Sequence, residues 1–283
     1  MPMVLVSCVR PPRFRHPYVE QARDAIADLA RRRESPSTGA ILSTLSVTQE
    51  WTRGDAIYNN RPPSLIAPPV QIYNPAFVTF IREMSHPCST IEFSHKELDK
   101  ALRFIYASLG FYGDKSDRRA MVHDLHALGN LFPPEINLRS RIIEPDGTAT
   151  VRCHTTNQEA IVRIVEMKNE IGEGRSDPIM QAECGFVLIC SSEEVSRFLI
   201  SLTCIRLLLL QYEPLRNASC VPMFLVGVAG PHLTVSGAVF AERFVSQRLT
   251  DYIYLGPLNP SGGPGSPCTG QSHGRAQRLL LKA

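Results

Sequence analysis

The spacing of hydrophobic residues changes near residue 141. Before that point, apolar positions follow a helical period, which predicts helices at residues 18–33, 76–83, 94–109 and 115–131. After it, apolar residues form short runs rich in Val, Ile and Thr. These runs predict strands at residues 148–154, 160–167, 223–229 and 233–240. The chain is therefore predicted to be an α/β protein with a helical N-terminal half.

Local signals mark several boundaries. Ser94-His-Lys-Glu97 has the spacing of a capping box, and Asp177-Pro178 has an N-cap residue followed by proline at the first helical position. Five prolines between residues 59 and 75 predict an extended segment, because proline lacks the amide donor that helices and sheets use. The predicted regions are an N-terminal helix and linker at 1–60, an α/β domain at 61–256 and a disordered tail at 257–283.

Two apolar segments have the length of membrane spans. Residues 221–241 carry no charge, but their glycines and prolines predict two buried strands around a Gly-Pro turn. Residues 186–210 are rich in leucine, and four charged side chains interrupt them. Neither segment is predicted to cross a membrane.

The net charge and the cysteine content bear on the expected partners and on the cellular compartment. The formal net charge of +3 gives no strong reason to expect nucleic-acid or membrane binding. The eight cysteines include no C-x-x-C pair, and several lie in apolar runs, where cysteine acts as a small hydrophobic residue. This usage is typical of a reducing compartment, so we expect an intracellular protein in the cytoplasm or nucleus.

The residues that could support catalysis lie between Pro145 and Gln181. Strand alternation predicts that Glu166 and Lys168 share one face and that Met167 lies on the other. Asp146, at the entry to a neighbouring strand of a hairpin, could reach the same face. Two carboxylates would then hold a divalent cation such as Mg²⁺, and the lysine would act on a water or a phosphate.

A simpler interpretation of the same residues is equally consistent with the sequence. Asp146-Gly147 could be a type I′ hairpin turn, with Glu166 and Lys168 forming an exposed surface pair.

Pro145-Asp146 followed by Glu166-Met-Lys168 resembles the motif of the PD-(D/E)XK nucleases, over roughly residues 141–240. This resemblance implies a restriction-endonuclease-like mixed sheet flanked by helices. It implies metal-binding roles for Asp146 and Glu166, and Lys168 would serve the attacking water. Gln181 stands where some of these nucleases carry glutamine, but the tyrosine that often follows is missing. The expected activity is hydrolysis of DNA or RNA phosphodiesters.

A second resemblance is spread over residues 55–256. Its segments are Arg61-Pro-Pro-Ser-Leu-Ile-Ala-Pro-Pro-Val-Gln-Ile-Tyr-Asn-Pro75, Glu166-Met-Lys-Asn-Glu-Ile-Gly172, Ser176-Asp-Pro178 with Gln181, Val228-Ala-Gly-Pro231 and Arg248-Leu-Thr-Asp-Tyr-Ile-Tyr-Leu-Gly256. They are similar to the N-terminal region of kinase-like proteins of mushroom-forming fungi.

That resemblance implies an architecture and no established activity. The chain has no Gly-rich loop with a following lysine, no H-R-D-type loop and no D-F-G, so we do not expect a kinase. The alternative function is a non-catalytic interaction or regulatory module with protein partners. Relatives of this family pass quickly from the glutamine-containing helix to the next strand. Residues 186–210 are therefore expected to be an insertion that packs poorly.

Overall fold

The computed structural model describes residues 17–86, 94–125, 136–138, 141–153, 158–200 and 205–256. The helices are α1 (Pro17–Ala30), α2 (Pro36–Gly39), α3 (Leu42–Thr48), α4 (Pro75–Ser85), α5 (His95–Ser108), α6 (Lys115–Leu125), α7 (Pro178–Ser191) and α8 (Tyr212–Ala218), with 3-10 turns η1 (Val70–Ile72) and η3 (Glu173–Arg175). The predicted tail and the predicted end of the helix at 126–131 lie outside the described residues.

The strands form two sheets. They are β1 (Ile57–Tyr58), β2 (Ile136–Leu138), β3 (Arg141–Ile143), β4 (Gly147–Cys153), β5 (Gln158–Lys168), β6 (Glu194–Ile200), β7 (Ile205–Gln211), β8 (Met223–Ala229), β9 (His232–Phe240), β10 (Phe244–Arg248) and β11 (Ile253–Tyr254). The larger sheet has seven strands in the order β1-β10-β9-β8-β5-β4, with β11 paired to β9. The smaller has four, in the order β3-β2-β6-β7.

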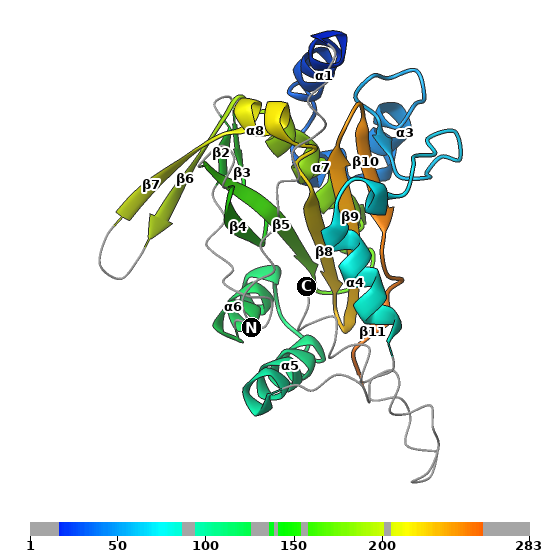
Figure 1. The fold of residues 1–283 in the computed structure, drawn as a ribbon. Coiled ribbons are helices and arrows are strands. Elements are labelled where there is room, and N and C mark those ends of the chain that lie inside the picture. Colours follow the sequence, from blue (N-terminus) through cyan, green and yellow to red (C-terminus); the bar gives the residue numbers. More distant parts are fainter. Residues whose placement is uncertain are drawn as a thin grey trace.

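Helices cover both faces of the seven-stranded sheet, as Figure 1 shows. On one face, α7 and α1 pack against apolar residues of β5, β8, β9 and β10. On the other, α4 and α5 cover Val165 and Met167 of β5 and their neighbours in β8 and β9. The sheet is mixed, because β5 is parallel to β8 and antiparallel to β4. The predicted α/β architecture, a mixed sheet flanked by helices, is therefore confirmed.

The core on the α7 side of the sheet extends across the domain boundary predicted at residue 60. Ile26, Ala27 and Ala30 of α1 are buried in the same cluster as α7. In addition, Ile57 of β1 pairs in parallel with Phe244 of β10, so β1 extends the sheet by one strand. Residues on both sides of that boundary therefore share one core.

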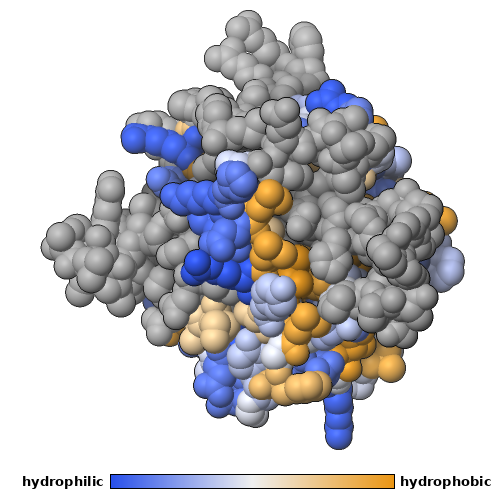
Figure 2. Space-filling model, turned by 90° about the horizontal axis from the view of Figure 1, so that it is seen from below, coloured by the Kyte–Doolittle hydropathy of each residue, from blue (hydrophilic) through white to orange (hydrophobic). Residues whose placement is uncertain are grey.

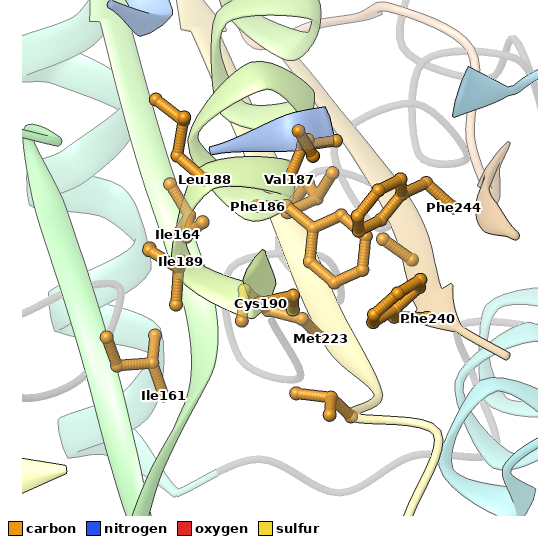
Figure 3. Close-up of a cluster of buried hydrophobic side chains, with 14 of the residues drawn as sticks. Ile161, Ile164, Phe186, Val187, Leu188, Ile189, Cys190, Met223, Phe240 and Phe244 are labelled. Atoms are coloured by element: carbon orange, nitrogen blue, oxygen red, sulfur yellow. The ribbon is translucent and has the colours of Figure 1, made fainter. Parts of the chain in front are cut away.

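Helix α7 provides the crossover between the parallel strands β5 and β8, a connection that parallel neighbours require. Every residue of α7 is buried, since the helix lies between the sheet and α1. Figure 3 shows Ile189 beside Ile164, Cys190 beside Met223, and Phe186 directed toward Phe240 and Phe244. A helix in this position is apolar on all sides, which the sequence pattern alone does not separate from an inserted segment.

The expectation that residues 186–210 are a poorly packed insertion is therefore wrong for their first part. Phe186–Cys190 belong to the largest core, and α7 ends at Ser191. The charged positions that interrupted the apolar run come after this end. Glu194 begins β6, whose backbone pairs antiparallel with β2 on one side and with β7 on the other.

Several local predictions are confirmed. Ser94 and Glu97 form the capping box of α5, and the Asp177 side chain accepts a hydrogen bond from the Ile179 amide at the start of α7. Residues 223–229 and 232–240 form the antiparallel pair β8 and β9 in place of a membrane span. No helix among the described residues is long and apolar enough to cross a membrane.

Gly227 of β8 allows the first turn of α7 to approach the sheet. A Cβ at this position would lie 2.8 Å from Ile179 Cγ1 and 3.2 Å from the Ile179 backbone nitrogen. We expect Gly227→Ala to lower the free energy of unfolding by about 1–3 kcal/mol, the range for overpacking a core. Urea denaturation followed by circular dichroism measures the change.

Gly113→Ala is the matched control, because its new Cβ would meet only Asp117 Oδ2, at 3.9 Å. Equal stability of the two variants would show that α7 does not depend on this close approach.

Candidate functional site

Strand β5 places Glu166 and Lys168 on the face that α7 covers. Met167, between them, is buried in the core of the opposite face, as the predicted alternation requires. Both charged side chains are buried, Glu166 to 1% exposure and Lys168 to 8%. The alternative of an exposed surface pair is therefore wrong.

Asp146 immediately precedes β4 and is fully buried. Its Oδ2 accepts a hydrogen bond of 2.7 Å from the Met167 backbone amide, which holds the carboxylate against β5. The strands before and after Asp146, β3 and β4, belong to different sheets, so Asp146-Gly147 is not the hairpin turn of the simpler interpretation. The hairpin that does form is β4–β5, in which Gly147 pairs with Val165.

Gln181 joins the site from the first turns of α7. Its Nε2 donates a hydrogen bond of 2.7 Å to Glu166 Oε2. The sequence-predicted residues Asp146, Glu166 and Gln181 are thus in one buried cluster. Lys168 is close enough for the two carboxylates to act on the pKa of its side chain.

Two basic residues of α6 complete the cluster, and sequence reasoning missed both. Lys115 Nζ lies 2.7 Å from Asp146 Oδ2 and 3.8 Å from Glu166 Oε2. Arg119 Nη1 lies 3.7 Å from Asp146 Oδ1. The predicted helix beginning at residue 115 contained these residues, but nothing in its pattern indicated that its first turns would meet β5.

Burial and the neighbouring charges shift the pKa values of Glu166 and Lys168. Burial, and then the negative charge of Asp146, raise the pKa of Glu166 well above its ordinary value, against the opposing effect of Lys115 and Lys168. Burial, and then the Lys115 ammonium, lower the pKa of Lys168, and the carboxylates of Glu166 and Asp146 oppose this shift. Perturbed groups gathered in this way are typical of functional sites, although structural ion pairs produce them too.

The loop after β5 passes next to the Lys168 ammonium. A Cβ on Gly174 would lie 3.5 Å from Lys168 Nζ. Gly174 has a φ of 66°, in the left-handed region that glycine enters without steric cost. Glycine therefore lets the loop turn close to the lysine.

The oxygen atoms of this cluster fit a hard divalent cation. While both carboxyl groups are ionised, Asp146 Oδ1 and Gln181 Oε1 are buried without a hydrogen-bond partner among the described residues. Carboxylate and amide oxygens are the ligands that Mg²⁺ and Ca²⁺ prefer. The fit is limited to two carboxylates, since no group of three His, Cys, Asp or Glu residues that could hold a metal occurs in the described ranges.

A second polar network fixes the start of α7. Asp177 accepts hydrogen bonds from the Tyr252 hydroxyl at 2.9 Å and from Arg248 Nη2 at 3.3 Å. Six residues further along, Glu183 is buried and accepts a hydrogen bond of 2.8 Å from Asn59 Nδ2. Burial raises the pKa of Glu183, while the nearby Ser246 hydroxyl and the hydrogen bond from Asn59 oppose the shift. This network orients the helix that carries Gln181.

Comparison of the chain with models of known protein families, with curated proteins and with solved structures finds no match. The resemblances to PD-(D/E)XK nucleases and to a fungal kinase-associated region stay predictions that rest on the residues quoted for them.

Proposed function

We propose that this protein is a metal-dependent nuclease with a restriction-endonuclease-like core, which hydrolyses phosphodiesters of DNA or RNA. The observation that carries the proposal is the burial of Asp146, Glu166 and Lys168 in one cluster at the end of β5, with Gln181 bonded to Glu166. Burying several charges together is costly in free energy, and functional sites are a common reason for keeping such a cluster.

Each residue of the cluster has a distinct part in this proposal. Asp146 and Glu166 would hold Mg²⁺. When bound, this ion would offset negative charge on the phosphate and lower the pKa of a water molecule. The Met167 amide orients Asp146, and Gln181 orients Glu166. Lys168 would hold a proton near the attacking water and stabilise negative charge that develops on the phosphate. Burial lowers the pKa of Lys168, which makes the release of that proton easier.

A non-catalytic interaction module is the second candidate, and two observations favour it. Lys115 already contacts both carboxylates, so the cluster is also a set of ion pairs that forms without a metal. At the end of the molecule where α5 and α6 lie, Tyr106 and Phe111 are exposed. The face seen from below carries a band of hydrophobic residues beside hydrophilic ones (Figure 2), a surface suited to a protein partner.

A cleavage assay with Glu166→Gln separates the two candidates. The purified wild type is incubated with fluorescent single- and double-stranded DNA and RNA, in Mg²⁺ or Mn²⁺. We expect the wild type to cleave at least one substrate and the variant to lose about 100-fold or more of that rate, because an amide is a poorer ligand for a hard cation. The thermal stability of the metal-free variant should equal or exceed that of the wild type, since a neutral amide is less costly to bury than a carboxylate.

The exposed acidic residue Glu50 provides the matched control, as Glu50→Gln changes the same charge on the surface just after α3. A folded wild type that cleaves none of these substrates, or cleavage that Glu166→Gln retains, would decide for the interaction module.

A further inference from the structure

The ammonium group of Lys115 lies where it contacts both carboxylates of the proposed metal site. It is 2.7 Å from Asp146 Oδ2 and 3.8 Å from Glu166 Oε2. A divalent ion shared by the same carboxylates would need ligand distances of about 2.0–2.6 Å. Two cations cannot occupy this position together, because they exclude each other by size and repel each other by charge.

The balance of charge leads to the same conclusion. Asp146 and Glu166 carry two negative charges when ionised, whereas Lys115, Lys168 and Arg119 carry three positive charges, all within one cluster. A divalent cation that approached this set would therefore find no net attraction. Removal of the Lys115 ammonium takes away the positive charge that lies closest to both carboxylates.

We propose that Lys115 is an internal cation that a divalent metal must displace, so that this residue sets the metal affinity of the site. The inference rests on the proposed function, because it takes Asp146 and Glu166 as the metal ligands. It adds regulation to that site: the protein without metal is held in an ion-paired state, and metal binding has to break the ion pairs first.

Hydrogen bonds of Arg118 and Asp114 hold the body of α6 in place. Arg118, in the same helix, is buried, and its guanidinium donates to the carbonyl oxygens of Ser108, Gly230, Gly110 and Asn169. At the start of α6, Asp114 Oδ1 accepts a hydrogen bond from the Asp117 amide. The helix is thus fixed to the sheet and to the end of α5.

The Lys115 side chain, by contrast, is 34% exposed and has a path to solvent. Asp146 keeps its bond from the Met167 amide, and Glu166 keeps its bond from Gln181, when Lys115 leaves. We therefore expect rotation of the Lys115 side chain to open the site while α6 remains in place.

The test is a titration of the metal-free full chain with Mn²⁺, in which electron paramagnetic resonance measures the free ion. Lys115→Met removes the charge and keeps most of the apolar stem. We expect this variant to bind Mn²⁺ about tenfold more tightly or better, the gain that follows if the lysine-displaced state makes up about a tenth of the wild type. Lys115→Arg keeps the charge and should bind as weakly as the wild type.

Two controls make the result specific. Lys96→Met, on the exposed surface of α5, should leave the affinity unchanged. Lys115→Met combined with Glu166→Gln should lose the gain, since one of the two carboxylates is gone. Thermal unfolding without metal verifies that each variant is folded. If Lys115→Met does not fold, Lys115→Gln serves as the second variant that removes the charge.

Equal or weaker Mn²⁺ binding by the charge-removing variants would overturn the inference, and so would no binding by any variant. This outcome can be told apart from failure of the nuclease proposal. Tighter binding without cleavage would support the role of Lys115 and reject the nuclease. Cleavage by the wild type with unchanged affinity in Lys115→Met would support the nuclease and reject the role of Lys115.

Discussion

Replacement of Lys168 by alanine is expected to reduce Mg²⁺-dependent cleavage by about 10²- to 10³-fold, a typical loss when a preorganised group that stabilises transition-state charge is removed. The ammonium is buried beside Glu166 and the Gly174 loop, so water would replace it poorly. The effect should appear mainly in kcat, because the charge matters most in the transition state. Steady-state assays on the preferred substrate measure it.

The matched control is Lys96→Ala, which removes the same charge from the exposed surface of α5. We expect Lys168→Ala to fold, because burying this ammonium is itself costly in free energy, and thermal unfolding verifies it. A variant that retains the wild-type rate would remove Lys168 from the reaction, and the assignment of the Glu-x-Lys motif would have to be abandoned.

Phe186→Ala is expected to lower the free energy of unfolding by about 3–5 kcal/mol, the cost of truncating a buried phenylalanine. Its ring is fully buried and contacts Phe244 edge-to-face, with 6.1 Å between ring centroids. Phe244 in turn stacks on Phe240 at 4.2 Å, so the substitution leaves a cavity beside a packed pair (Figure 3). Chemical denaturation followed by far-ultraviolet circular dichroism measures the loss.

Phe111→Ala is the comparison for this variant, because Phe111 is 95% exposed and its truncation should change stability by no more than about 0.5 kcal/mol. If Phe186→Ala proves equally mild, α7 does not hold the core together, and the idea that residues 186–210 are an insertion returns.

The sequence predicted the parts of the fold that depend on neighbouring residues. The cap at Asp177, the capping box at Ser94 and the paired strands β8 and β9 follow from short local signals. The shared face of Glu166 and Lys168 follows from strand alternation alone. The candidate site could therefore be placed on β5 from the sequence, together with the residue before β4.

The remaining features depend on tertiary contacts. Lys115 reaches Asp146 because α6 packs against the end of β5, and no periodicity in α6 encodes that meeting. Short strands such as β1 and β11 acquire their structure from their partners β10 and β9. Phe186 is expected in an insertion because the fungal resemblance implies a short connection here, and a helix buried on all sides has no polar face to contradict that expectation.

The bond between Asp146 and the Met167 amide also affects the edge of the sheet. Strand β4 begins at Gly147, opposite Val165, so β5 extends beyond the end of its neighbour. A backbone amide buried at such an end without a hydrogen-bond partner would cost free energy. Asp146 Oδ2 accepts the Met167 N–H and takes the place of a missing backbone carbonyl. The carboxylate thus completes the hydrogen bonding of the sheet where β4 stops, and this gives Asp146 a structural role even where no metal is bound.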